Sequence, residues 1–176
     1  MRTLAHSLKA WLAFTLITGL AFPLAVWIFG MLFYPQKANG SILRRDGQPV
    51  GSLLLAQKTN GDRYIHPRPS AGDYATTPSA ASNASWTDKS SRERLASLPP
   101  SAEDHSQSAS GLDPDVTPES AIWQLQKVAK SRGWSEASRK KAEEWVAANT
   151  HGGIISPAYV NVLQLNLAID LIPAGK

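Results

Sequence analysis

The sequence predicts an α+β fold in which a single N-terminal transmembrane helix is followed by one small soluble α/β domain. Residues 10–34 form an uncharged tract of 25 residues, and the rest of the 176-residue chain combines a hairpin signal with capped amphipathic segments. A helix over the tract would be ~37 Å long, enough to cross a hydrocarbon core of ~30 Å. The stretch after the tract, of about 140 residues, has the size of one domain.

We interpret the tract as a retained membrane span, with a cleaved signal peptide as the alternative. A signal peptide carries only ~7 to 15 apolar residues before a small-residue cleavage site. The tract is longer than this, and residues 35–39 offer no such site. Trp11 and Tyr34, near its two ends, are typical of the water interfaces of a membrane. Pro23 should kink the helix and leave one carbonyl without its usual donor.

One face of the predicted span carries small and hydroxyl side chains. Such residues let the backbone of another helix approach closely. Two interpretations stay open here, a face for contact with another helix or an ordinary anchor that faces lipid. The candidate intramembrane contact residues are Thr15, Thr18, Gly19, Ala21 and Ala25.

The charges around the span favour a cytoplasmic N-terminus. Arg2 and Lys9 precede the tract, although further cations follow it and reduce the asymmetry. We therefore expect residues 1–9 to be a cytoplasmic head without a fold of its own. Residues 10–34 would cross the membrane, and residues 35–176 would form an extracytoplasmic soluble domain.

Composition excludes several classes of site. The chain has no cysteine, which rules out disulfides and thiolate zinc sites. Beyond the span, 16 Lys and Arg residues nearly balance 14 Asp and Glu residues, a charge ratio that disfavours nucleic acid as a partner. The chain also lacks a phosphate-binding glycine loop and paired histidines at metal spacing. It is therefore expected to be no enzyme, with no metal and no cofactor bound by the chain alone.

The soluble domain should begin with a small antiparallel sheet. Asp46 and Gly47 suit a tight two-residue turn between apolar residues at 42–43 and 50–55. Residues 63–66 are expected to add a third short extended piece, which ends at two prolines. From 70 to 110 the chain is rich in serine, with 11 serines among 41 residues. This flexible loop, with one short helix over 88–98, would be disordered or held by a partner.

The C-terminal part carries clear helix signals. Thr117 and Pro118 suit the start of a helix that Gly133 ends, and Ser135 starts a second helix that runs to about 149. Residues 160–170 fit a strand or a helix capped by Asn161, and we favour the helix after an extended start. The inward face of the first helix should carry Ala121, Ile122, Leu125, Val128 and Ala129.

Two charged groups could carry chemistry or only structure. Asp113 and Asp115 fit either a carboxylate pair or a turn into a helix N-terminus, and the turn is the simpler interpretation. Arg68 lies between two prolines and can hold a carboxylate such as Asp113, or face a partner. A hydrolase site cannot be assembled from Ser70, His66 and Asp113.

Five short motifs follow the span in a fixed order. They are Gly51–Leu54 with Gln57, Arg68–Ala71, Ser110–Pro114, Val160–Leu163, and Leu165–Ala168 with Asp170. In order and spacing the chain resembles the C subunit (KdpC) family of the Kdp potassium-transporting P-type ATPase. The sequence departs from this family in the middle, where residues 79–83 lack the usual glycines and the following segment is shortened.

The resemblance implies a non-catalytic accessory and assembly subunit of a high-affinity, ATP-driven potassium import pump. Its partners would be a potassium-translocating, channel-like subunit and an ATP-hydrolysing P-type subunit in the bacterial inner membrane, with the domain in the periplasm. At family level it would act as a catalytic chaperone that raises the ATP affinity of the hydrolysing subunit. The alternative is a membrane-tethered periplasmic binding or envelope protein. Candidate structural or partner-contact residues are Arg68, Ser70, Asn83, Asp113, Asn161 and Asn166.

Overall fold

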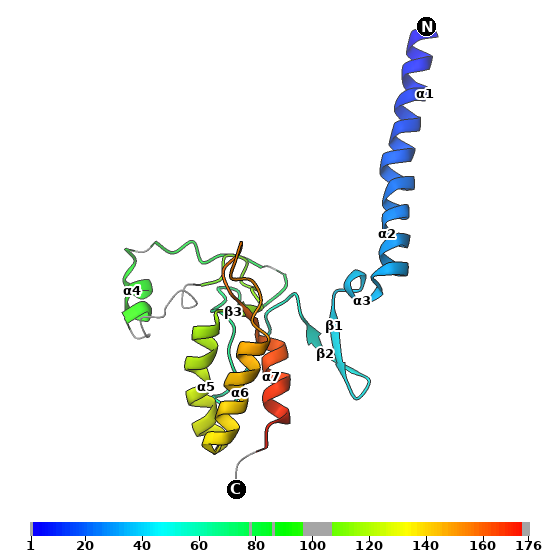
Figure 1. The fold of residues 1–176 in the computed structure, drawn as a ribbon. Helices are drawn as coiled ribbons and strands as arrows, with labels where there is room; N and C mark the ends of the chain where they lie inside the picture. Colours follow the sequence, from blue (N-terminus) through cyan, green and yellow to red (C-terminus); the bar gives the residue numbers. More distant parts are fainter. Residues whose placement is uncertain (1, 78, 86, 97–106, 174–176) are drawn as a thin grey trace. The chain divides into compact units, whose positions relative to one another are not determined.

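The chain forms two compact units in a computed structural model, residues 1–42 and 43–176. The structure describes residues 2–77, 79–85, 87–96 and 107–173. The first unit is mainly one helical run, and the second contains the small strands and the packed helices (Figure 1). The mixed content of helices and strands confirms the predicted α+β class.

The helices of the first unit have no buried side chains. It consists of α1 (Arg2–Leu16), the π-helical turn η1 (Ile17–Ala21) and α2 (Phe22–Phe33), followed by the short α3 (Pro35–Ala38). Within the described part of the chain, Arg2–Phe33 is the one helix long and apolar enough to cross a membrane. Residues 1–9 were expected to be a head without a fold of its own, and residues 2–9 form the first turns of the helix that continues into the predicted span.

The π-helical turn explains how the helix passes Pro23. Proline has no amide hydrogen, and its ring clashes with the carbonyl four residues earlier, which here belongs to Gly19. The chain widens into η1 just before this point, and the Phe22 amide donates to the Ile17 carbonyl, five residues back. The disturbance predicted at Pro23 therefore takes the form of one wide turn inside a continuous helical run.

The second unit begins with the predicted hairpin. Strands β1 (Ile42–Arg45) and β2 (Gln48–Ser52) pair in a two-stranded sheet. Asp46 and Gly47 both have positive φ, 52° and 79°, as a type I′ turn requires. The expected third extended piece at 63–66 is wrong, because these residues form turns and irregular backbone outside both sheets.

A second small sheet joins distant parts of the chain. Strands β3 (Asp115–Val116) and β4 (Val160–Asn161) pair antiparallel, with Asp115 opposite Asn161 and Val116 opposite Val160. Both strands lead directly into helices, so the sheet fixes where those helices start. The serine-rich segment contains α4 (Lys89–Ala96), as predicted, although positions 97 and 98 of the predicted helix lie outside the described residues.

The helices of the second unit are α5 (Pro118–Arg132), α6 (Glu136–Ala148) and α7 (Val162–Leu171). Each starts at a predicted cap, where the side chain of Thr117, Ser135 or Asn161 accepts a hydrogen bond from the backbone three residues later. Gly133 ends α5 in the left-handed region, with φ of 64°. The predicted helix at 160–170 is therefore confirmed, with the extended start at β4.

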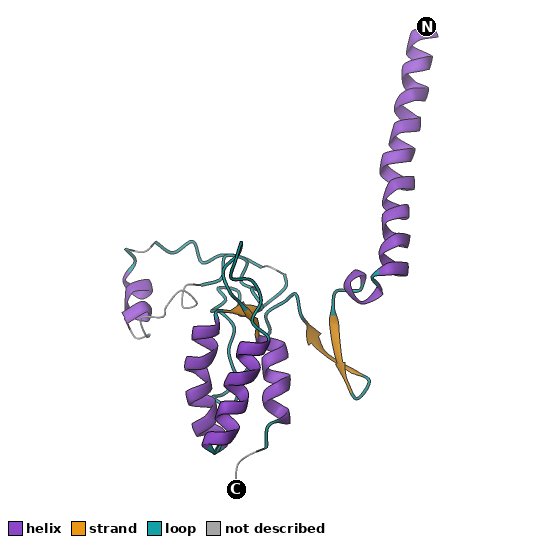
Figure 2. Cartoon of the chain, viewed as in Figure 1, coloured by secondary structure: helices purple, strands orange, loops and turns teal. Residues whose placement is uncertain are grey.

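The core of the second unit lies between these helices, which run side by side in Figure 2. Ile122 was expected to face this core but is 40% exposed, because the buried stripe of α5 follows Ala121, Leu125 and Val128 and leaves Ile122 beside it. The buried side chains of the core are Ile65, Val116, Ala121, Leu125, Val128, Ala142, Val146, Val160, Val162, Leu165 and Ile169.

Candidate functional site

Two side-chain amides clamp the backbone at Ile65 and His66. Asn166 on α7 accepts from the Ile65 amide and donates to the Ile65 carbonyl, both at 2.8 Å. Gln124 on α5 likewise accepts from the His66 amide at 2.8 Å and donates to the His66 carbonyl at 3.1 Å. These four hydrogen bonds give the backbone amides and carbonyls of two consecutive residues their partners, without pairing to a neighbouring strand. We call Gln124 and Asn166 the amide clamp.

The amide clamp accounts for the failed strand prediction at 63–66. Ile65 is fully buried against the helices, so its backbone groups need partners inside the protein. A carboxamide offers one donor and one acceptor side by side, as the edge of a β-strand does. The segment therefore follows an irregular path across α5 and α7, and its apolar side chain fills the core.

An ion-pair network around Asp170 ties further segments to the end of α7. Arg132, whose side chain is 8% exposed, donates to Asp170 at 2.9 Å and to the Arg63 carbonyl at 2.7 Å. Arg45 from the hairpin reaches the other carboxylate oxygen at 3.2 Å. The Arg132 guanidinium also lies 4.7 Å from the centre of the Tyr64 ring.

This network lowers the pKa of the Asp170 carboxyl. Burial by itself raises the pKa, but hydrogen bonds from Arg132 and Tyr64, the charge of Arg132 and the contact with Arg45 outweigh it. The carboxylate is thus held in its charged form. The pair of Arg132 and Asp170 is better shielded from water than the exposed pair of Lys58 and Asp73.

Arg68 and Asp113 form the ion pair that the sequence suggested, at 2.9 Å. Both side chains are half-buried, and Arg68 also donates to the Gln107 carbonyl at 3.3 Å. The other oxygen of Asp113 accepts from the Asp115 amide at 3.1 Å, which makes the turn that leads into β3. The arrangement matches a structural role for the two aspartates better than an acid-base pair.

Asn161 joins the two ends of the domain. Its oxygen caps α7 through the Gln164 amide at 3.2 Å, and its nitrogen donates to Asp115 at 2.9 Å and to the Leu53 carbonyl at 3.0 Å. Burial raises the pKa of the Asp115 carboxyl, and the nearby charge of Asp113 adds to this, against the hydrogen bond from Asn161 and the attraction of His151.

The remaining predicted residues lie apart from one another. Ser70 accepts from the Tyr74 amide at 3.0 Å, and its hydroxyl lies close to Gly111, whose φ is 72°. Asn83 is exposed in the serine-rich segment and has a positive φ of 51°. The structure thus brings Asp113 and Asn161 together through Asp115, but it does not bring Ser70, Asn83 and Asn166 into one site.

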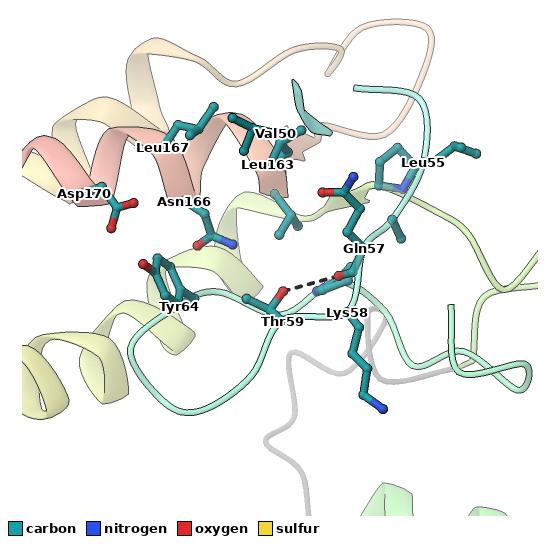
Figure 3. A pocket seen from close by; sticks show the side chains of 14 residues that line it. Val50, Leu55, Gln57, Lys58, Thr59, Tyr64, Leu163, Asn166, Leu167 and Asp170 are labelled. Carbon is teal, nitrogen blue, oxygen red and sulfur yellow. Dashed lines mark hydrogen bonds between the residues drawn. The ribbon is translucent and has the colours of Figure 1, made fainter. Parts of the chain in front are cut away.

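A pocket of about 210 Å³ lies beside α7 (Figure 3). Leu163 and Leu167 of α7 line it together with Val50 and Leu55. Polar side chains in the lining include Tyr64, Asn166 and Asp170. Gly51 lies so close to Gln57 that a Cβ at this position would overlap the glutamine amide. This close approach gives a physical reason for a glycine and a glutamine at these positions.

Neither the pocket nor the rest of the described chain offers a metal site. Within the described residues, no group of three or more His, Asp or Glu side chains is placed to hold a metal ion. The polar groups near the pocket already bond to the backbone or to each other, as Asn166 and Asp170 do. The site therefore holds segments of the chain together.

The two threonines of the span bond within their own helix. Thr15 donates to the Trp11 carbonyl at 2.9 Å and Thr18 to the Phe14 carbonyl at 2.7 Å, each one turn back. Gly19, Ala21 and Ala25 are exposed on the first unit. The face therefore presents short side chains without a polar group that needs a partner from another helix.

Sequence reasoning missed Gln124, Arg132 and Tyr64. A glutamine inside an amphipathic helix and an arginine in its last turn look like ordinary surface residues. The one available signal was position, because Gln124 lies one residue before the buried Leu125 and Arg132 directly before the helix end at Gly133. Their partners are 58 and 38 residues away in sequence, beyond the reach of local patterns.

Comparisons with known proteins give a consistent result over nearly the whole chain. The family model described as "K+-transporting ATPase, c chain" (KdpC) matches residues 4–171. The potassium-transporting ATPase KdpC subunit of Pseudomonas aeruginosa is 39% identical over 179 positions, which cover 96% of each chain. The protein of the same name from Rhodopseudomonas palustris is 38% identical and covers 90% of this chain and 92% of its own.

A third relative is matched over nearly the whole of both chains. The KdpC subunit of Burkholderia vietnamiensis is 38% identical over 195 positions, which cover 99% of this chain and all of the relative. The alignment is longer than the 176 residues of this chain, so the chain lacks residues that this relative has.

Proposed function

The chain belongs to the KdpC family of K+-transporting ATPase c chains, and from this premise we propose that it is the assembly subunit of a high-affinity potassium import pump. Membership makes it an accessory subunit of the potassium-transporting ATPase and not the catalytic one. The observation that carries the assembly role is the helix Arg2–Phe33, which has no buried side chain of its own. A helix of this kind needs lipid or other helices around it.

The proposed partners are the channel-like subunit that translocates potassium and the P-type subunit that hydrolyses ATP. The small face at Thr15, Thr18, Gly19, Ala21 and Ala25 would contact another span, since short side chains allow close helix packing. Arg68, Ser70, Asn83, Asp113, Asn161 and Asn166 would act by holding the domain in the shape that its partners meet. The bonds of Asn161 to the Leu53 carbonyl and of Asn166 to the Ile65 carbonyl support this role, as does the pair of Arg68 with Asp113.

The proposed location is the bacterial inner membrane. Residues 1–9 would lie on the cytoplasmic side, residues 10–34 would cross the membrane, and residues 35–176 would lie in the periplasm. Arg2 and Lys9 before the span support this orientation. A cysteine fused at either end and labelled with a membrane-impermeant thiol reagent in intact spheroplasts tests it, because only the C-terminal cysteine should react.

An increase in the ATP affinity of the hydrolysing subunit is a finer role that the family resemblance supports. With the domain in the periplasm, cytoplasmic ATP lies across the bilayer, so the effect would have to pass through the span. The test is the KM for ATP of the pump purified with the intact chain and with a chain whose span is replaced. An equal KM in both preparations would argue against transmission through the span.

The assembly role is tested by deleting the gene for this chain in its host. We expect growth and ATP-driven potassium uptake at micromolar external potassium to be lost, and to be restored by the intact chain. A chain with an unrelated apolar span should fail to restore uptake if packing inside the membrane matters. Uptake that persists after the deletion would overturn the proposal and favour a membrane-tethered envelope protein.

A further inference from the structure

The loop between α6 and α7 presents two isoleucines at its tip. His151 and Tyr159 close the base of the loop with two backbone hydrogen bonds of 2.9 Å. At the tip, the Gly153 amide donates to the Ser156 carbonyl at 2.8 Å, so Ile154 and Ile155 occupy the bend between these two residues. Figure 1 shows this loop reaching beyond the helix ends on the side of β3. We call residues 151–159 the isoleucine loop.

The two side chains are as exposed as an unfolded chain would leave them. Ile154 is 97% and Ile155 101% exposed, more than any other large apolar side chain in the described part of the protein. A single exposed apolar residue is normal, but two adjacent β-branched residues at a turn are against the usual polar composition of loops. Nothing in the described fold of the domain needs them there.

The loop is also built to hold its shape. Gly152 and Gly153 have φ of 80° and 94°, and a Cβ at Gly152 would overlap the Pro157 carbonyl. Side chains are strained in this backbone region, so glycine is required at these positions. The rings of His151 and Tyr159 face each other at 5.7 Å across the base. A loop held at its base and at its tip presents the isoleucines in one arrangement.

Two kinds of occupant fit the loop poorly. A membrane-binding loop combines apolar side chains with Lys or Arg for the lipid head groups, but the sequence has neither residue type between Lys141 and Lys176. A second copy of the chain would need about 800 Å² of buried surface on each partner, and two side chains at a narrow tip supply a small part of this. The loop therefore suits a larger interface that other contacts of the chain already hold.

We propose that Ile154 and Ile155 insert into an uncharged, apolar depression on another subunit of the same pump. This inference rests on the proposed assembly function, because the span must first bring the partner close. Apolar anchors that fill a pocket at a protein interface carry much of its binding energy. The absence of charge on the loop selects a partner surface without charge, and the tight turn lowers the entropy lost on binding.

The test uses the full chain copurified with the pump subunits in mild detergent. The variant Ile154→Ser with Ile155→Ser should lower the half-life of the chain on the complex at least about tenfold, because two apolar side chains leave the interface. The matched variant Ile154→Val with Ile155→Val should retain nearly all of the wild-type half-life. Leu171→Ser changes an apolar side chain that is 77% exposed elsewhere and should have no effect.

A photoreactive residue at position 155 identifies the occupant in the reconstituted complex. Cross-linking to another pump subunit supports the proposal, whereas cross-linking to lipid, to a second copy or to nothing overturns it. An equal half-life for the serine variant and the wild-type chain would also overturn it. If the wild-type chain never copurifies with the pump, the proposed assembly function itself fails. If the wild-type chain copurifies and the serine variant dissociates no faster, only the present inference fails.

Discussion

The helix that would cross the membrane and the helices of the soluble domain use polar side chains in opposite ways. In the first unit, Thr15 and Thr18 bond to carbonyls one turn back in their own helix. In the second unit, Asn166 bonds to a residue 101 positions away, and Arg132 to residues 69 and 38 positions away. The helices of the first unit have no buried side chain, and the second unit has a closed apolar core.

The difference indicates where each unit finds its stability. A helix that satisfies its own polar groups can be placed in lipid, and its contacts are left to partners. A small domain with two-stranded sheets has few long ladders, so side chains must supply the bonds between segments. Substitutions in the domain should therefore change the free energy of unfolding. Substitutions on the small face of the span should change assembly and leave that free energy unaltered.

The largest effect is expected for Arg132→Ala. The change leaves Asp170 with a weaker partner and removes the bond to the Arg63 carbonyl, so the free energy of unfolding should fall by about 2–3 kcal/mol. Thermal unfolding of the full chain in detergent measures it. Lys58→Ala breaks an exposed ion pair and serves as the control, with an expected change below about 0.5 kcal/mol. Equal changes in the two variants would contradict the structural role of the network.

The amide clamp should come next in size. Asn166→Leu and Gln124→Leu each leave one amide and one carbonyl of the 65–66 segment without a partner, at a cost of about 2 kcal/mol. Gln126→Leu makes the same change at an exposed position of α5 and should be nearly neutral. The double variant at 124 and 166 should lose less than the two single losses together, because both act on one segment. Strict additivity would mean that the residues act separately.

Most of the domain could be predicted from local patterns, and the clamp could not. The turn at Asp46 and Gly47 and the helix caps at Thr117 and Ser135 depend on neighbouring residues, and all of them are confirmed. The segment at 63–66 has the composition of a strand, but its partners are side chains on α5 and α7. Local sequence carries no record of such distant contacts, so the strand prediction was wrong.

The candidate site could be predicted only in part, because some of its contacts are local in sequence and others join distant segments. Arg68, between two prolines, was predicted to hold a carboxylate such as Asp113 or to face a partner, and the structure shows the pair with Asp113. Asn161 was expected as a cap, although its bonds to Asp115 and the Leu53 carbonyl depend on the β3 and β4 pairing. The prediction that Ile122 faces the core was wrong. Helix periodicity shows which residues share an apolar stripe, but it does not show which edge of the stripe packs against the core.

A substitution at Gly19 tests the prediction for the first unit, that changes on the small face alter assembly and not stability. Gly19→Leu adds bulk to the small face and should lower the yield of pump subunits that copurify with the chain about tenfold. The unfolding midpoint of the soluble domain should stay the same, because no side chain of the span is buried. Ala13→Leu adds similar bulk on the opposite side of α1 from Thr15 and is the control. A loss of domain stability in Gly19→Leu would break the comparison.

The smallest effect, with the opposite sign, is expected for Asp115→Asn. The raised pKa of this carboxyl, due to burial and to Asp113, means that its charged form is less favourable in the folded protein. Its contribution to stability is therefore fully present below the unfolded pKa of about 3.9 and is lost as the pH rises through the folded pKa. The asparagine keeps an oxygen for Asn161 and should be more stable than wild type at pH 7.

The gain from Asp115→Asn should stay below about 1 kcal/mol, because the site is only half-buried and the attraction of His151 is lost with the charge. Unfolding measured from pH 3 to 7 should show the advantage growing as the pH rises. Asp170→Asn gives the opposite profile, because the pKa of Asp170 is lowered and its stabilisation is lost as the pH falls. If the stability of Asp115→Asn and of Asp170→Asn, each compared with wild type, changed with pH in the same way, the net charge of the domain would set its stability. The separate partners of the two carboxylates would then not matter.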